Sequence, residues 1–383
     1  MLALVTGPEE VLESWGTGGR QVSFASLRDL SLRLMPMTIM MEEILQQPAA
    51  LSALRKYYAS PGAIQLKALR KLVAHWPPTV VFTGMGSSLF AAYPAQVFLN
   101  SLGIRTLVWE TAELLHHHLT FLGRDTLLVM VSQSGETVEI IRLLDNLPDG
   151  MGAVAVVNKL DSALARRASV LLPMMAGPQR AASTKTYTCA VAVLMYLAFA
   201  MARRPHRALT QALKLAIEAQ ERILERAEVL IPPTAEFFDA PSYVALMSRG
   251  ADLASVYQGA LMFKEVTRFG AEPISAAQFR HGPLEIINPA HRYVIFARQR
   301  RTGKLLLKLA ADIRTHGGRV LLLTDLPFDD LTHVRLIRVE PMRLGLGTLI
   351  DSVHIQLLAH ELALRAGREP GKFRIAEDVT REE

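Results

Sequence analysis

Short apolar runs alternate with longer stretches of helical character along most of this chain. Each run is rich in β-branched residues and is continuous, which is typical of strands that helices cover on both faces. The pattern occurs twice, with runs at residues 79–83, 127–131, 153–157 and 170–172, and again at 243–247, 293–296, 320–323 and 334–337. Such alternation predicts an α/β fold with two doubly wound parallel sheets in tandem, joined by right-handed crossovers.

Helical stretches and proline breaks divide the chain into six segments. Long helices are expected at about 183–201 and 349–364, where they close the two copies. A connecting helix is expected to begin at Arg207 and to end at Pro232-Pro233, because proline disrupts a helix interior. The predicted segments are an N-terminal extension (1–37), a helical lead-in (38–78), a first domain (79–205), the connecting helix (206–240), a second domain (241–368) and a C-terminal tail over the site (369–383).

Composition narrows the class of protein. The chain has 383 residues, more than one hydrophobic core usually serves, and its 50% apolar and 20% charged residues exclude a disordered protein. Its single cysteine, Cys189, excludes an intramolecular disulfide and fits a reducing compartment. The N-terminus has no basic segment before Glu9, and no run of about eighteen uncharged apolar residues follows. We therefore expect a soluble, cytoplasmic protein that does not enter a membrane.

The net charge of +6 indicates an anionic partner. No aromatic residues alternate with the basic ones, so nucleic acid is not the expected partner. His116-His117-His118 cannot close on one ion, because consecutive helical side chains point about 100° apart, and we expect no metal. Gly84-Met85-Gly86 is too short for a dinucleotide fingerprint, and we expect no cofactor. A small phosphorylated ligand fits the sign of the charge best.

One loop after a predicted strand has the composition of a phosphate site. Ser132-Gln133-Ser134-Gly135-Glu136-Thr137 follows the strand that ends at Val131 and opens a helix at about Val138. Backbone N–H groups and the helix dipole favour an anion there, and Gly135 permits its close approach. Glu136 fits beside a phosphate only if its side chain points away or caps its own helix.

Two further helix starts carry hydroxyl groups. Gly86-Ser87-Ser88 follows the first strand, and Ala182-Ser183-Thr184 opens the helix that closes the first copy. The matching loop of the second copy, residues 298–303, has no such hydroxyl cluster. Ser and Thr are also ordinary helix caps that need bind nothing. Three such starts at one edge of a parallel sheet nevertheless predict a phosphate site in the first copy.

These loops resemble the three ligand loops of the SIS (sugar isomerase) phosphosugar domain. The tandem arrangement resembles the isomerase half of glutamine–fructose-6-phosphate aminotransferase (glucosamine-6-phosphate synthase) and related amino-sugar deaminases, and the likeness runs from about residue 38 to the C-terminus. It implies a flavodoxin-like fold for each copy and no amidotransferase half, hence no glutaminase activity. The phosphosugar-binding residues that it implies are Gly86, Ser87, Ser88, Ser132, Gln133, Ser134, Thr137, Ala182 and Ser183.

Two residues of the second copy match catalytic positions of that family. Glu265 matches the base that moves a proton between C1 and C2 of an open-chain sugar, and its spacing from Gln258 and Met262 predicts one shared helix face. His281, in a loop that resembles the family's, matches the residue that opens the sugar ring. Without the resemblance, Glu265 could equally belong to an ion-pair face and His281 to a structural turn.

The chain departs from the family at three positions. Synthases of the family carry a lysine where Met262 stands and a glutamate where Gln258 stands. Their imine-forming lysine in the tail is replaced by Glu377, which follows Ala376 in the segment expected to contact the site, and the nearest upstream amine is Lys372. A glutamate forms no Schiff base, so we expect proton transfer rather than an imine with the enzyme.

The predicted function is therefore an isomerase or deaminase for a hexose or hexosamine 6-phosphate, of the glucosamine 6-phosphate/fructose 6-phosphate type. Enediol proton transfer would proceed without cofactor or metal. Two alternatives stay open, a deglycase for phosphorylated fructosamines and a phosphosugar sensor without catalysis. The resemblance also implies a homodimer in which the base and His281 of one site come from different subunits.

Overall fold

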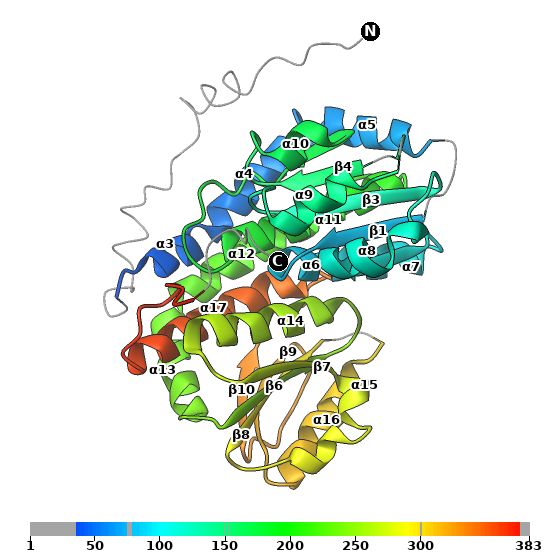
Figure 1. Ribbon diagram of the computed structural model, residues 1–383. Coiled ribbons are helices and arrows are strands. Elements are labelled where there is room, and N and C mark those ends of the chain that lie inside the picture. Colours follow the sequence, from blue (N-terminus) through cyan, green and yellow to red (C-terminus); the bar gives the residue numbers. More distant parts are fainter. Residues whose placement is uncertain (1–35, 75–78, 149, 152, 299–300, 376–383) are drawn as a thin grey trace.

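Two parallel sheets form the framework of the molecule in the computed structural model, which describes residues 36–74, 79–148, 150–151, 153–298 and 301–375 (Figure 1). Each sheet has five strands, and all neighbouring strands pair in parallel. Helices flank both sheets. The predicted fold class, two doubly wound α/β units in tandem, is confirmed.

The first sheet lies in the N-terminal half of the chain. Its strands are β1 (Thr79–Gly84), β2 (Thr106–Glu110), β3 (Thr126–Ser132), β4 (Ala153–Val157) and β5 (Val170–Pro173), in the order β2-β1-β3-β4-β5. Its helices are α6 (Ser87–Phe90), α7 (Tyr93–Ser101), α8 (Thr111–His117), α9 (Val138–Asp145), α10 (Ala163–Arg167) and α11 (Lys185–Met201). Every residue of α11 is buried, so this helix lies at the centre of the unit.

The second sheet repeats the same strand order. Its strands are β6 (Tyr243–Ser248), β7 (Ala271–Ser275), β8 (His291–Ala297), β9 (Arg319–Thr324) and β10 (Val334–Arg338), in the order β7-β6-β8-β9-β10. Its helices are α14 (Leu253–Met262), which continues as a π-helical segment (Phe263–Thr267), α15 (Ala276–Phe279), α16 (Gly303–Thr315) and α17 (Gly347–Arg365). The two sheets therefore correspond strand for strand.

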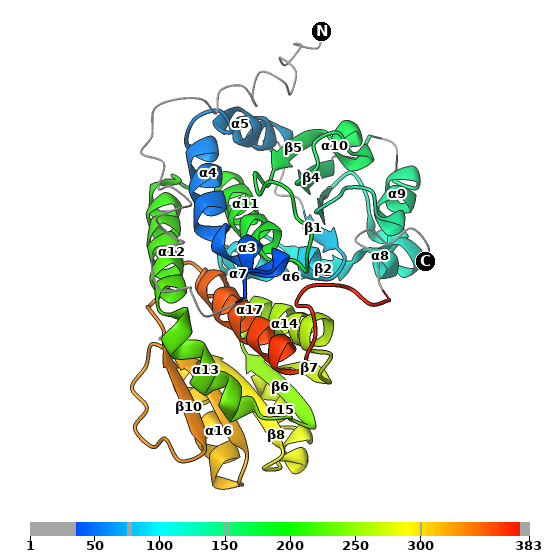
Figure 2. The same ribbon diagram turned by 90° about the vertical axis from the view of Figure 1, so that its left-hand side faces the viewer.

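Additional helices join the two units. They are α3 (Ile39–Leu45), α4 (Gln47–Ala59) and α5 (Ala63–Leu72) before the first sheet, and α12 (Arg207–Glu225) and α13 (Ala227–Phe238) between the sheets. Helix α4 packs on both α11 and α12, and α12 packs on α17 (Figure 2). One apolar cluster contains side chains of α4, α11, α14 and α17. The two units therefore share a core, which fixes how their facing edges lie.

The prediction that Pro232-Pro233 ends the connecting helix is wrong, because α13 continues to Phe238 with both prolines inside it. The chain instead breaks at Arg226, between α12 and α13. Thr234 Oγ1 donates to the Leu230 carbonyl at 2.7 Å, and the side chain of Phe238 is fully buried. These contacts keep the segment helical although two backbone N–H groups are missing from it.

Two strands have no counterpart among the predicted apolar runs. They are β2 and β7, which occupy one edge of each sheet. Most residues of both strands are partly exposed, and β7 contains Pro273, which an edge strand tolerates because one side of its backbone is unpaired. An edge strand needs no continuous apolar run, so the periodicity does not indicate it. Among the helices that the structure describes, none is long and apolar enough to cross a membrane.

Candidate functional site

The turn after β1 lies against a helix of the second unit. Gly86, with φ of +51°, precedes Ser87 at the start of α6. A Cβ on Gly86 would lie 3.5 Å from Leu261 Cδ2, which belongs to α14. Ser87 and Ser88 are both partly buried. The first hydroxyl-bearing turn and α14 therefore face each other across the two units.

The loop after β3 folds on its own hydroxyl groups. Ser132 Oγ accepts a hydrogen bond from the Gly135 N–H at 2.9 Å, and Ser134 Oγ accepts one from the Glu136 N–H at 3.2 Å. Gly135 has φ of +65°, and a Cβ there would lie 2.3 Å from Ser162 Oγ. The loop thus has a fixed shape that only glycine permits, and it ends at Thr137, the N-cap of α9.

Neighbouring loops hold this loop in place. The Gln133 carbonyl accepts from the N–H groups of Asn158 and Lys159, both at 3.2 Å. Asn158 Nδ2 in turn donates to the Gly177 carbonyl at 2.8 Å, which connects the loops after β3, β4 and β5. Glu136 does not cap its own helix, because its Oε1 accepts from the Ala163 N–H at 2.7 Å, at the start of α10. Its negative charge is therefore directed toward a neighbouring helix N-terminus.

The third loop contacts the second unit directly. Ala182 is fully buried, and Ser183 Oγ lies 3.0 Å from Thr186 Oγ1 in the first turn of α11. The Ser183 carbonyl accepts from Gln258 Nε2 of α14 at 3.2 Å. Gln258 is 2% exposed, so this contact is shielded from water. Helix α14 therefore touches both the first and the third of the predicted ligand loops.

Glu265 lies about two turns beyond Gln258, in the π-helical segment that continues α14. Its side chain is partly buried, and burial raises its pKa to about 7, although neighbouring Lys264 opposes the shift. The Thr267 carbonyl, at the end of the segment, accepts from the Arg368 guanidinium. Short π-helical segments occur often at functional sites. A carboxyl with this pKa can both accept and release a proton near neutral pH.

His281 lies in an exposed turn after α15. Its backbone N–H donates to the Gln278 carbonyl at 2.9 Å. Among the residues that the structure describes, no hydrogen bond or ion pair joins its ring to Glu265. Within one chain, the structure thus brings α14 to the serine loops without bringing His281 into contact with the proposed base.

The residues that bear on an imine with the enzyme lie in three different settings. Met262 is 1% exposed and belongs to the shared core. Lys372 is exposed and pairs with Glu369 at 2.9 Å. Ala376 and Glu377 lie outside the described residues. The tail nevertheless approaches the third ligand loop, because a Cβ on Gly371 would lie 2.9 Å from Ala181 Cβ.

Sequence reasoning missed one residue that supports the ligand loops. Glu43 in α3 is 1% exposed, and its carboxylate accepts from the backbone N–H of Arg180 at 2.6 Å. A signal was present, because Glu43 shares the helix face of Met40 and Ile44, which are both fully buried. A carboxylate on an apolar helix face needs hydrogen-bond donors from elsewhere in the fold.

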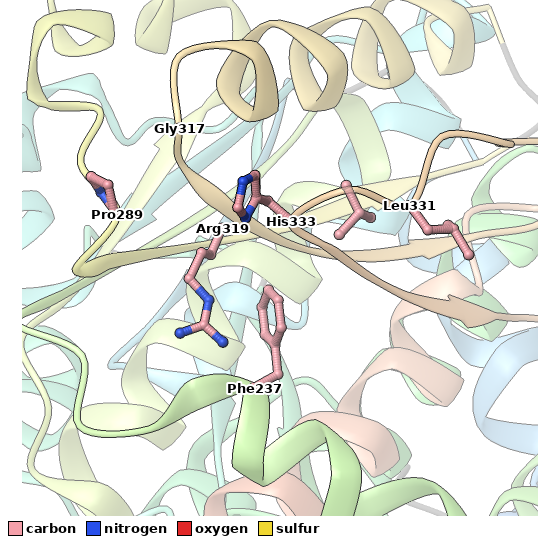
Figure 3. A pocket seen from close by; sticks show the side chains of 7 residues that line it. Phe237, Pro289, Gly317, Arg319, Leu331 and His333 are labelled. Carbon is pink, nitrogen blue, oxygen red and sulfur yellow. The ribbon is translucent and has the colours of Figure 1, made fainter.

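A surface hollow of about 630 Å³ lies elsewhere, at the far end of the second sheet (Figure 3). The Arg319 guanidinium stacks on the Phe237 ring there, 4.6 Å from its centroid. Arg319 and Val334 begin β9 and β10, so the hollow opens at the amino ends of the strands. Open parallel sheets bind their ligands beyond the carboxyl ends, and we therefore place the candidate site at the serine loops.

Residues 73–200 of the chain match the SIS domain. The match covers all five strands of the first sheet and nearly all of α11, the elements that carry the three loops. The first unit is therefore the part of the chain that is similar to a SIS domain. The second unit repeats the strand order of the first.

Among curated proteins, the chain is similar to the isomerizing glutamine–fructose-6-phosphate aminotransferase of Thermococcus kodakarensis. The two are 27% identical over 359 residues, which cover 85% of this chain and 57% of the relative. The corresponding enzyme of Pyrococcus horikoshii is 28% identical over 316 residues, which cover 79% of this chain and 51% of the relative. The chain thus spans about half the length of these curated relatives.

A solved structure supports the same fold assignment. The C-terminal domain of glucosamine-fructose-6-phosphate aminotransferase from Francisella tularensis superposes with a TM-score of 0.79 at 20% identity, over 88% of this chain and 98% of that chain. Another is glucosamine-6-phosphate deaminase from Thermotoga maritima, with a TM-score of 0.70 at 18% identity over 90% and 100% of the two chains. Both likenesses are below 25% identity and support the fold of two parallel α/β units.

Proposed function

We propose that this protein isomerises or deaminates a hexose or hexosamine 6-phosphate, of the glucosamine 6-phosphate/fructose 6-phosphate type. The observation that carries the proposal is Glu265, a partly buried carboxyl with a pKa of about 7. Glu265 lies in the segment that continues α14. In α14 itself, Gln258 contacts the loop at Ser183, and Leu261 lies beside the turn at Gly86. A phosphate at the serine loops would leave the reactive carbons on the side of α14.

The proposed chemistry needs one base and no electron transfer. Glu265 removes the proton from C2 of an open-chain aldose 6-phosphate, and the resulting enediol takes the proton back at C1 to give the ketose. With glucosamine 6-phosphate, the same transfer turns C2 into an imine carbon, which water hydrolyses to fructose 6-phosphate and ammonia. Met262 is buried and offers no amine, so the proposal includes no imine between sugar and enzyme.

Turnover of defined sugar phosphates tests this proposal. The protein should release ammonia and fructose 6-phosphate from glucosamine 6-phosphate, or exchange the C1 proton of fructose 6-phosphate with D₂O. Glu265→Gln should lower kcat about 10²- to 10⁴-fold, the usual contribution of a general base. Glu218→Gln, a surface change on α12, is the matched control and should retain full activity. Absence of both reactions in the unmodified protein, or full activity of Glu265→Gln, would contradict the proposal.

We further propose that His281 opens the sugar ring from the partner subunit of a homodimer. Its exposure, and the lack of a bond to Glu265 among the described residues, support a role at another chain's site. Co-expression of Glu265→Gln with His281→Ala tests this, because a mixed two-fold dimer then contains one site with both residues intact. Random mixing should restore about a quarter of full activity. Activity no higher than that of the two variants alone would place both residues in one chain's site.

A further inference from the structure

A buried carboxylate outside the proposed catalytic pair supports the third ligand loop. Glu43 belongs to α3 and is 1% exposed. It accepts from the backbone N–H groups of Arg180 at 2.6 Å and Ala181 at 3.2 Å, and the Gln179 side-chain amide also donates to it. Burial raises the pKa of Glu43, while these two backbone hydrogen bonds and nearby Lys185 oppose the shift. One carboxylate thus holds three consecutive residues just before Ala182 and Ser183.

Gln179 extends this support to the hydroxyl groups of the loop. Its Nε2 lies 3.1 Å from Thr184 Oγ1, and its Oε1 accepts from the backbone N–H and the hydroxyl of Thr186 at 3.3 and 3.0 Å. Thr186 Oγ1 in turn lies 3.0 Å from Ser183 Oγ. A continuous set of hydrogen bonds therefore leads from Glu43 to Ser183. Such networks restrict every group in them more than isolated bonds do.

The helix that carries Glu43 is itself attached to the second unit. Thr38 Oγ1, at the N-cap of α3, lies 2.9 Å from His360 Nε2 of α17. Gln47 Nε2, at the start of α4, donates to Gln356 Oε1 of α17 at 2.7 Å. Both contacts join residues more than 300 positions apart in the chain. The position of Glu43 is thus defined by the second unit, and that of the loop by Glu43.

We propose that Glu43 is a positioning residue, which keeps the Ala182-Ser183 loop in its anion-binding shape and registers it against the unit that carries Glu265. The inference deepens the proposed function, because the loop matters only if it binds a phosphosugar. Glu43 touches no reacting atom in this role. Its effect passes through the backbone of Arg180 and Ala181 and through the Gln179 side chain.

Glu43→Gln tests the inference. In the unmodified protein the donors of Gln179, Arg180 and Ala181 share two carboxylate oxygens, whereas the variant offers them one amide oxygen. Hydrogen–deuterium exchange of residues 179–186 should accelerate at least tenfold, whereas exchange in β3 and β4 should stay unchanged. Fructose 6-phosphate, titrated calorimetrically, should bind at least tenfold more weakly, and KM should rise with little change in kcat. Glu42→Gln is the matched control, because the Glu42 carboxylate pairs with the exposed Arg180 guanidinium at 3.1 Å rather than with the backbone of the loop.

The two measurements separate this inference from the proposed function. Unchanged exchange at residues 179–186 in Glu43→Gln would overturn the positioning role, whatever the protein binds. Faster exchange there, with no fructose 6-phosphate binding by the unmodified protein, would support the positioning role of Glu43 and contradict the proposed function. Gln179→Ala offers a second route if Glu43→Gln does not fold, because it breaks the link to Thr184 and Thr186 from the loop side. It should weaken fructose 6-phosphate binding to a similar extent, and unaltered affinity would count against the network.

Discussion

The two units have one topology but use the carboxyl edge of the sheet in opposite ways. In the first unit, the loop after β3 presents hydroxyls, backbone N–H groups and Gly135. In the second, β8 is followed by Arg298, whose guanidinium is buried and pairs with Asp351 of α17. Arg298 also lies 3.7 Å from Asp252, in the turn after β6, and donates to the Gly347 carbonyl at 3.2 Å.

Two copies of one fold thus have different roles in this molecule. In the second unit, the turn after β6, the loop after β8 and the start of α17 correspond to the ligand loops of the first. One buried ion cluster joins these three places, and its members are Asp252, Arg298 and Asp351. Burial lowers the pKa of Arg298, but Asp351 and Asp252 raise it by more, so the guanidinium stays charged. A Cβ on Gly347 would lie 2.1 Å from Arg298 Nε, which leaves no room for a ligand. In the proposed function the first unit takes the anion, while the corresponding edge of the second unit is closed by its own side chains and that unit carries α14 and Glu265.

Breaking the closed cluster should have the largest effect. Asp351→Ala takes the hydrogen-bonded carboxylate away from the buried Arg298 guanidinium, and removal of one partner from a buried pair costs about 3–5 kcal/mol. We expect a loss near the lower end of that range in the free energy of unfolding, measured by urea denaturation at pH 7. Combining Arg298→Met with Asp351→Leu and Asp252→Asn, which removes all three buried charges together, should recover most of this loss.

The control is an exposed ion pair of similar geometry. Arg222 and Glu340 lie 2.6 Å apart with both side chains nearly half exposed, and Glu340→Ala should cost less than about 1 kcal/mol. If Asp351→Ala is as mild as Glu340→Ala, the cluster is not what closes the second unit. The comparison between the two sheets would then rest on topology alone.

The pH dependence of stability gives a second test. Glu265 also belongs to the second unit, but within the described part of the chain no buried arginine pairs with its carboxyl. Its pKa is about 7 in the folded protein against an ordinary 4.5, so the folded state holds a proton between these pH values that the unfolded state has released. The contribution of Glu265 to the free energy of unfolding should therefore fall as pH rises from 4.5 to 7 and then level off, by up to about 3 kcal/mol.

Glu265→Gln should remove this dependence and make the protein relatively more stable at pH 8 than at pH 5. Urea denaturation of both proteins at the two pH values measures the difference. Glu218→Gln, on the surface of α12, should keep the slope of the unmodified protein. Parallel pH profiles for Glu265→Gln and the unmodified protein would mean that the carboxyl ionises at its ordinary pKa.

The sequence predicted the parts of this comparison that depend on local pattern. Continuous apolar runs marked the central strands, and the Ser132–Thr137 segment marked the loop between β3 and α9, because both signals lie within a few residues. That this loop binds a phosphate stays a prediction. The edge strands β2 and β7 were missed, because half-exposed strands lack such runs. Contacts between distant segments, such as Gln258 with Ser183 and Glu43 with Arg180, were missed for another reason. They depend on how the units pack, which no local pattern encodes.

The smallest expected effect tests whether the open loop of the first unit needs its glycine. Gly135→Ala adds a Cβ 2.3 Å from Ser162 Oγ and at φ of +65°, and we expect a loss of about 2 kcal/mol with weaker fructose 6-phosphate binding. Gly103→Ala is the matched control, because Gly103 has φ of +78° with no atom within 4 Å of an added Cβ. It carries the backbone strain without the collision, so it should cost about 1 kcal/mol and leave binding intact. Calorimetric titration and urea denaturation of both variants provide the comparison. Equal binding by the two would show that the anion does not approach the backbone at Gly135, and the contrast between an open first unit and a closed second one would lose its basis.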